Sequence, residues 1–265
     1  MAKLGFIGMG NMGHAMLKGA LKVFDKSEIV FSDANEERMK RVCTETGVEY
    51  VLSNAECANQ SKYIILAVKP QFFDTVIQNI VNIVTPEHVI ITIAAGITID
   101  YLQKALGPGI RIVRAMPNTA ALLGEGMTGV AYDRTALNFE EQDVIKKLFN
   151  SIGKAKLIDE KMMNTVICAS GSSPAYVYMF IEALADSVVK YGMSRSDAYE
   201  FTAQMVLGSA KMVLETKAHP GILKDMVCSP GGTTIAGVEA LEEFGFRNAI
   251  MKATDACYNK AKSME

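Results

Sequence analysis

Short β-branched and aliphatic runs alternate with longer amphipathic stretches over about the first 160 residues. The pattern predicts strands at residues 3–7, 29–31, 63–67, 89–93, 111–115, 128–132 and 156–158. It predicts helices at residues 12–23, 36–46, 72–83 and 140–151, the last beginning with a capping box of Asn138 and Glu141. Such alternation is typical of βαβ units, so we expect an α/β fold with a doubly wound, mainly parallel sheet.

The pattern changes at about Lys161, after which no further strand is expected. Helices are predicted at residues 161–169, 174–190, 197–216, 221–227 and 235–262, with a break near Gly245 in the last. Ser173 and Pro174 fit the N-cap and first position of one helix, and Ser194 with Asp197 resembles a capping box. We therefore expect two domains, residues 1–160 and residues 161–265.

The predicted helix over residues 174–189 is apolar on nearly every side. Its apolar residues are Ala175, Val177, Tyr178, Phe180, Ile181, Ala183, Leu184 and Ala185. A helix of this kind has to be enclosed by other helices. One small domain could hardly surround it, so we expect it to lie at a subunit interface.

A G-x-G-x-x-G motif, Gly8 to Gly13, directly follows the first predicted strand and opens a helix. In that context the motif predicts a Rossmann dinucleotide-binding turn. Gly8 would allow the tight turn, Gly10 the approach of the pyrophosphate, and Gly13 close packing of helix on strand. The alternative is a glycine turn that binds no ligand.

The end of the second strand, which normally distinguishes NAD from NADP, consists of Ser32, Asp33, Ala34 and Asn35. Asp33 would suit the ribose diol of NAD. Ser32 and Asn35 could instead hydrogen-bond a 2′-phosphate, and the positive charge of Arg38 or Lys69 would lie nearby. Asp33 could equally be a turn or capping residue. The cofactor is therefore NADPH or NADH, with a slight preference for NADPH.

Two glycine- and serine-rich breaks interrupt the helical half, at residues 169–174 and 229–234. Each directly precedes a predicted helix. The second break would present backbone N–H groups and hydroxyls at a helix N-terminus, which suits a small carboxylate. The alternative is a simple helix–helix turn with Thr233 as the cap.

Composition narrows the choice of function. A net charge of −2 gives no broad reason to expect nucleic acid or an anionic membrane as partner. Five cysteines without a C-x-x-C spacing indicate reduced thiols, and three distant histidines indicate no metal site. No signal peptide precedes the first strand, and the apolar run Val89–Ile99 is shorter than a membrane span and predicts a buried strand. We expect a cytoplasmic protein.

Six stretches resemble pyrroline-5-carboxylate reductase, in order and over essentially the whole chain. They are Gly5–Gly13, Leu66–Pro70, Ala94–Gly96, Arg114–Thr119, Ser170–Tyr176 and the stretch from His219–Gly221 through Lys224–Asp225 to Ser229–Thr234. The first is shared with many Rossmann enzymes, whereas the last two are much more specific. The resemblance implies NAD(P)H-dependent reduction of L-1-pyrroline-5-carboxylate to L-proline, the final step of proline biosynthesis. It also implies an N-terminal Rossmann domain and an all-helical C-terminal domain that binds substrate and dimerises, with dimers often assembling further.

The resemblance also implies roles for individual residues. Besides the glycine turn (Gly8, Gly10, Asn11, Met12, Gly13) and Ser32 and Asp33, the cofactor would contact Asn54, Ala67, Val68, Lys69, Ala94, Ala95, Met116 and Asn118. The substrate carboxylate would bind Ser229, Gly231, Gly232 and Thr233, while Thr234, the catalytic residue, would reach the ring nitrogen. A protonated imine is already electrophilic, so the protein mainly has to hold it against the nicotinamide and exclude water.

Three alternatives remain open. A β-hydroxyacid dehydrogenase shares the glycine turn but places a catalytic lysine on a helix after a glycine-rich segment in its second domain. Here no lysine follows Ser170–Tyr176 until Lys190. The others are a reductase of another cyclic imine and a nucleotide-sensing protein, which would have little use for the loop at residues 229–234.

Overall fold

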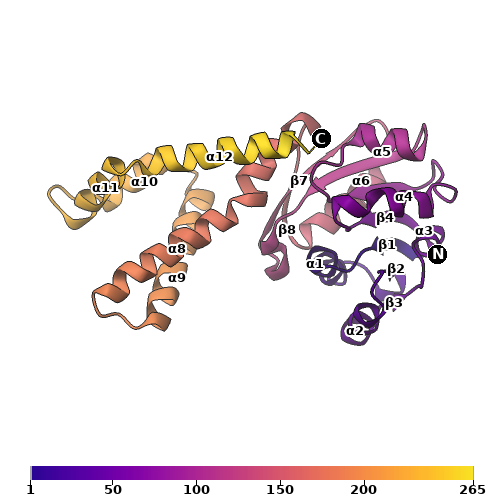
Figure 1. Cartoon of the computed structure of the whole chain (residues 1–265), viewed down its shortest axis with the longest axis horizontal. Coiled ribbons are helices and arrows are strands. Elements are labelled where there is room, and N and C mark those ends of the chain that lie inside the picture. Colours follow the sequence, from indigo (N-terminus) through magenta and orange to yellow (C-terminus); the bar gives the residue numbers. More distant parts are fainter. Residues whose placement is uncertain (1, 265) are drawn as a thin grey trace. The chain divides into compact units, whose positions relative to one another are not determined.

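The computed structural model describes residues 2–264, and their elements are labelled in Figure 1. The chain forms two compact units. The first runs to Ser172 and also includes the C-terminal residues from Cys257 onward. The second comprises Ser173–Ala256.

The first unit is built on one sheet in the order β3-β2-β1-β4-β5-β6-β7-β8. Its strands are β1 (Ala2–Ile7), β2 (Ile29–Ser32), β3 (Glu49–Tyr50), β4 (Ser61–Leu66), β5 (Val89–Thr92), β6 (Arg111–Met116), β7 (Gly126–Tyr132) and β8 (Gly153–Leu157). The six strands β1 to β6 are parallel, β7 runs antiparallel to β6, and β8 pairs with β7 in parallel. The prediction of a mainly parallel sheet is confirmed.

Helices cover both faces of this sheet (Figure 1). They are α1 (Asn11–Ala20), α2 (Glu36–Thr46), α3 (Asn54–Gln60), α4 (Phe73–Ile80), α5 (Ile99–Leu106), α6 (Phe139–Asn150) and α7 (Met163–Val166). Shorter 3₁₀ turns are η1 (Lys26–Glu28), η2 (Pro70–Phe72), η3 (Thr119–Leu123) and η4 (Glu160–Met162), and η5 (Ile167–Ser172) is a π-helix.

Each face of the sheet has its own hydrophobic core. Phe6 points into the core under α1, α2 and α6, whereas the next residue, Ile7, points into the core under α3, α4 and α5. On β4, Ile65 points into the first of these cores and Ile64 into the second. A strand buried on both faces is continuously apolar, which is why the central strands are evident in the sequence. The predicted doubly wound Rossmann fold is thereby confirmed.

The second unit is helical, as predicted, and no strand follows β8 in the described residues. Its helices are α8 (Pro174–Lys190), α9 (Arg195–Thr216), α10 (Pro220–Val227), α11 (Thr233–Glu243) and α12 (Phe246–Lys262), the last of which continues into the first unit. Gly245, with φ of +73°, makes the expected break between α11 and α12. Among the described residues, no helix combines the length and apolarity required to cross a bilayer.

Several local expectations need correction. The elements β3, α3 and α5 were not expected from the pattern of apolar residues. The apolar run Val89–Ile99 forms a strand only over β5, because the chain turns at Gly96, whose φ is +78°, before α5 begins. The capping box of Asn138 and Glu141 is confirmed. Ser194 caps α9 by accepting from Asp197 N–H, while Ser173 has helical dihedrals because a π-helix runs directly into α8.

Candidate active site

The glycine turn joins β1 to α1 in a geometry that only glycine allows. Gly8 has φ of +98° and donates its N–H to the Ser32 carbonyl at 2.9 Å. A Cβ on Gly13 would lie 2.2 Å from the Gly8 carbonyl oxygen, so helix and turn touch directly. At Gly10 the situation is the opposite, because a Cβ there would meet nothing within 4 Å. The space beside Gly10 is open to a ligand.

A cleft of about 790 Å³ lies beside this turn, at the carboxyl ends of the parallel strands. Its place is the topological switch point between β1 and β4, where open α/β sheets bind their ligands. The predicted cofactor residues that line it are Gly8, Gly10, Asn11, Met12, Asp33, Asn54, Ala67, Val68, Lys69, Ala94 and Ala95. Lining residues without an assigned role in the sequence analysis include Pro70, Phe72, Thr75, Val76, Ile93 and Pro117.

Asp33 contacts the glycine turn itself. Its carboxylate accepts the Met9 N–H at 2.6 Å and the Asn35 N–H at 2.8 Å. Arg38 donates to both carboxylate oxygens, at 3.2 and 3.1 Å. The side chain therefore has a structural role in the turn while it borders the cleft, and its charge is balanced by a guanidinium.

The other groups after β2 differ from expectation. Asn35 is the N-cap of α2, accepting from Arg38 N–H at 2.8 Å, and it is not one of the residues that line the cleft. Ser32 is buried and donates its hydroxyl to Asn54 Oδ1 at 3.0 Å. Asn54 and Arg38 are the polar side chains that line the cleft here besides Asp33. Ser32 and Asn35 therefore do not line the cleft, and their side chains bind other groups of the protein.

At the far end of the cleft the chain passes through Ala94, Ala95 and Pro117. Met116 is buried in a small cluster with Met163 and Ile167. Asn118 donates from Nδ2 to the Ser170 carbonyl at 3.0 Å and accepts from Met127 N–H at 3.2 Å. Asn118 thus joins three segments of the first unit around this end.

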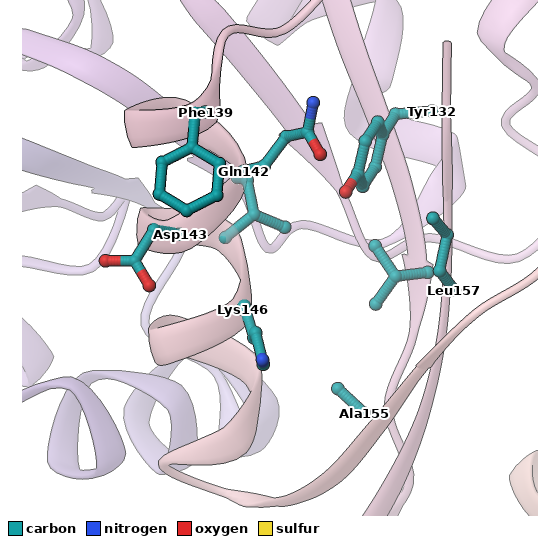
Figure 2. A pocket seen from close by; sticks show the side chains of 9 residues that line it. Tyr132, Phe139, Gln142, Asp143, Lys146, Ala155 and Leu157 are labelled. Atoms are coloured by element: carbon teal, nitrogen blue, oxygen red, sulfur yellow. The ribbon is translucent and has the colours of Figure 1, made fainter. Parts of the chain in front are cut away.

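A second, smaller hollow of about 380 Å³ lies elsewhere on the first unit (Figure 2). Phe139, Gln142, Asp143 and Lys146 project from α6, and Tyr132, Ala155 and Leu157 come from β7 and β8. None of the predicted site residues lines it. The larger cleft is therefore the candidate site, because it combines the glycine turn, the switch point and polar groups.

The loop Ser229–Thr234 belongs to the second unit. Gly231 has φ of +67°, and Gly232 donates its N–H to the Ser229 carbonyl at 3.0 Å. Helix α11 begins at Thr233 with Gly232 as N-cap, which supplies no side-chain acceptor. Thr233 is therefore not the cap, and no side chain caps the first N–H groups of α11.

The other predicted break is absent. Residues 169–172 lie in the π-helix η5, which leads through Ser173 into α8, and Ser170 donates its hydroxyl to the Val166 carbonyl at 3.2 Å. Serine and glycine were mistaken for a loop signal here. A π-helix is rare and has no reliable sequence signature, but it is common at functional sites.

No activated thiol or metal cluster accompanies the cleft. Burial raises the pKa of Cys57 to about 12, and burial with the neighbouring Cys257 raises the pKa of Cys168 to about 11. None of the five cysteines, all of which lie in the described part of the chain, forms a disulfide. Over residues 2–264, no group of three His, Cys, Asp or Glu residues could hold a metal ion.

Known proteins match the chain over both halves. A family model described as pyrroline-5-carboxylate reductase dimerisation matches residues 160–264, and one described as NADP oxidoreductase coenzyme F420-dependent matches residues 3–96. The pyrroline-5-carboxylate reductase of Escherichia coli (strain K12) is 44% identical over 99% of this chain and 98% of its own length. That of Methanosarcina acetivorans is 41% identical over 99% and 97%.

Solved structures give the same result. The Plasmodium falciparum pyrroline carboxylate reductase with NADP bound superposes with a TM-score of 0.89 at 34% identity, covering 99% of this chain and 98% of that one. The enzyme of Coxiella burnetii gives a TM-score of 0.91 at 30% identity, covering 100% and 98%. With full-length relatives above 40% identity and the glycine turn, switch-point cleft and helical half all in place, the chain belongs to the pyrroline-5-carboxylate reductase family.

Proposed function

We propose that this protein is an NAD(P)H-dependent oxidoreductase that reduces L-1-pyrroline-5-carboxylate to L-proline, the final step of proline biosynthesis. The observation that carries the proposal is the glycine-turn cleft at the sheet's switch point, in a chain that matches reductases of this name over its full length. When bound, a reduced nicotinamide supplies hydride to the carbon of the C=N bond.

The residues of this chain have a limited chemical task. A protonated cyclic imine is already electrophilic, so no strong acid is required. The protein has to bind the carboxylate, orient the ring and exclude water. The uncapped N-terminus of α11, with Ser229, Gly231, Gly232 and Thr233, suits the carboxylate. Thr234, the second residue of α11, is assigned to the ring nitrogen.

The cofactor is assigned to the cleft of the first unit. We place its pyrophosphate at Gly8, Gly10, Asn11, Met12 and Gly13. We assign the adenosine end to Asp33, Asn54, Ala67, Val68 and Lys69, with Ser32 acting through Asn54, and the nicotinamide to Ala94, Ala95, Met116 and Asn118. The open space beside Gly10 supports this placement of the pyrophosphate, because the backbone there is accessible to a bulky anion.

NADPH is the preferred cofactor in this proposal. The cleft carries two cations, Arg38 and Lys69, against one carboxylate, Asp33. Arg38 already balances Asp33, so a 2′-phosphate would not face an uncompensated negative charge. Asn54, whose side chain is oriented by Ser32, adds hydrogen-bonding capacity.

The two predicted domains have separate roles in this proposal. We assign dinucleotide binding to the predicted domain of residues 1–160 and substrate binding and dimerisation to residues 161–265, although the compact units divide at Ser172 and Cys257. Self-association is supported by the family model for the helical half and by the exposed apolar side chains of α8, among them Val177, Tyr178 and Met179. We further propose that dimers assemble into higher oligomers and that the protein acts in the cytoplasm.

A direct assay tests the function. Purified protein is mixed with pyrroline-5-carboxylate and either NADPH or NADH, and loss of the reduced cofactor and formation of proline are both measured. We expect stoichiometric proline with either cofactor and a higher kcat/KM for NADPH. The six-membered imine homologue serves as the comparison substrate. Tight cofactor binding without turnover of any cyclic imine would overturn the proposal.

A further inference from the structure

A buried arginine and a partly exposed glutamate form an ion pair on the strand that leads to the end of the cleft assigned to the nicotinamide. Arg114, on β6, is 1% exposed and donates from a terminal guanidinium nitrogen to Glu160 Oε1 at 3.1 Å. Two residues after Arg114 the chain reaches Met116 and then Pro117, which lines the cleft. One end of the pair therefore lies on the strand that leads into the site.

The same Glu160 oxygen reaches the second loop of the site. Glu160 Oε1 accepts the backbone N–H of Ile99 at 2.8 Å, across 61 positions of sequence. Ile99 is the first residue of α5, directly after the loop that contains Ala94 and Ala95. The carboxylate satisfies an otherwise open N–H at the positive end of that helix, a favourable placement for a negative charge.

The loop between β5 and α5 is also constrained at other positions. Thr92, where β5 ends, accepts the Ala94 N–H on its hydroxyl at 3.3 Å. Gly96 has φ of +78°, and a Cβ there would lie 2.7 Å from the Met264 carbonyl oxygen. The loop is thus pressed against the C-terminal segment on one side and tied to Glu160 on the other.

We propose that Arg114 and Glu160 are positioning residues for hydride transfer, an inference that rests on the proposed function. Neither is among the residues that line the cleft, so both act through the backbone. Thr92 and Arg114 are paired across β5 and β6, and the Arg114–Glu160–Ile99 chain of contacts fixes the spacing of the two loops that leave these strands. The rate of hydride transfer is sensitive to this spacing, because a displacement of about 1 Å between reacting groups can lower the rate on the order of a hundredfold.

Two variants test the proposal independently. Glu160→Ala removes the hydrogen bonds that Glu160 accepts from Arg114 and from the Ile99 N–H. Ile99→Pro deletes the N–H that Glu160 accepts, at the first position of a helix, where proline is well tolerated, and it shortens a side chain that packs against the core under α3, α4 and α5. Thr98, with ψ of 162°, already has the extended backbone that precedes proline. If Glu160→Ala fails to fold, Ile99→Pro still decides the question.

The matched control is Glu141→Gln. Glu141 is a carboxylate bound to another arginine of β6, Arg111, but its other partners are Lys62 and Asn138 rather than a loop of the cleft. For each folded variant we would measure kcat, the primary isotope effect with deuterated NADPH, and the affinity for 2′,5′-ADP, which reports the adenosine end alone.

We expect both test variants to lose about tenfold to a hundredfold in kcat and to show a larger isotope effect, with 2′,5′-ADP affinity unchanged. The control should retain wild-type kcat. Near-normal kcat in folded Ile99→Pro would overturn the proposal, as would a parallel loss of 2′,5′-ADP affinity or an equal loss in the control. Failure of the wild type to reduce pyrroline-5-carboxylate would instead overturn the proposed function.

Discussion

At the scale of single residues, the glycines of the first turn have different physical reasons to be glycine. Gly8 is required by its positive φ, and Gly13 by contact with the Gly8 carbonyl oxygen. Gly10 has φ of −68°, which any residue adopts, and no neighbour within 4 Å of its missing Cβ. The fold therefore does not require glycine at position 10, and a ligand is the remaining reason.

Substitution of these glycines should separate folding from binding. Gly10→Val should fold with a near-normal Tm but weaken NADPH binding by at least about tenfold, because the side chain occupies the space beside the turn. Gly13→Ala should instead lose about 1–3 kcal/mol of stability through overpacking. Thermal unfolding and fluorescence titration with NADPH measure both effects. Unchanged affinity in folded Gly10→Val would remove Gly10 from the cofactor site.

Thr234 offers a second test at this scale. Its hydroxyl is a poor acid, so we expect it to orient the substrate or relay a proton. Thr234→Val keeps the shape and should lose about 1.5–3 kcal/mol of transition-state binding, or roughly tenfold to a hundredfold in kcat/KM. Thr234→Ser keeps the hydroxyl and should retain most activity. If the valine variant is less stable but has near-wild-type kcat/KM, Thr234 only supports the start of α11.

At the scale of elements, helix α6 is attached to the sheet by one buried carboxylate. Glu141 is 1% exposed and closes the capping box by accepting from Asn138 N–H at 3.0 Å. Its other oxygen binds Lys62 of β4 at 2.8 Å and Arg111 of β6 at 2.5 Å. Burial alone would raise the pKa of Glu141, but the hydrogen bonds from Lys62, Asn138 and Arg111 outweigh it and lower the pKa below its usual value.

This shift makes part of the stability depend on pH. The folded state keeps Glu141 ionised at a pH where the unfolded chain takes up a proton. The contribution of Glu141 to the free energy of unfolding is therefore complete above the unfolded pKa of about 4.3, and it is lost as the pH falls through the lower pKa of the folded state. Urea unfolding between about pH 3 and pH 7 should show it. Glu141→Gln should be less stable at neutral pH by about 1.5–3 kcal/mol, and its stability should fall less steeply in acid. Parallel acid profiles for the two proteins would contradict the assignment.

At the scale of the whole molecule, the helical half has little core of its own. Of the residues of α8, only Ala185 is buried, and α9 buries only Ala198 and Thr202. Exposed apolar side chains continue along α9 and α10, among them Phe201, Leu214 and Met226. Apolar surface of this extent is typical of an interface between subunits.

We therefore expect an obligate homo-oligomer built from dimers. Light scattering and sedimentation at assay concentrations should detect no active monomer. Met179→Glu places a charge on the exposed face of α8 and should lower both assembly and activity. Lys154→Glu, on the edge strand β8 of the first unit, is the control and should leave assembly unchanged. A fully active monomer would contradict this expectation.

The sequence determined the features that depend on local periodicity and on backbone requirements. Continuous apolar runs identified the central strands because residues such as Phe6 and Ile7 are buried on opposite faces of one sheet. The glycine turn was evident because a positive φ and a close approach exclude side chains. The capping box of Asn138 and Glu141 was evident because both partners lie within one turn.

The tertiary structure decided what depends on contacts between distant segments. It showed that Asp33 binds the Met9 N–H and Arg38, that Asn35 is a helix cap, and that Ser170 lies in a π-helix. The bond between Glu160 and Ile99 spans 61 positions, and no local pattern predicts it. Local preferences fix which elements form, but the partners of a polar side chain are set by which elements the fold brings together.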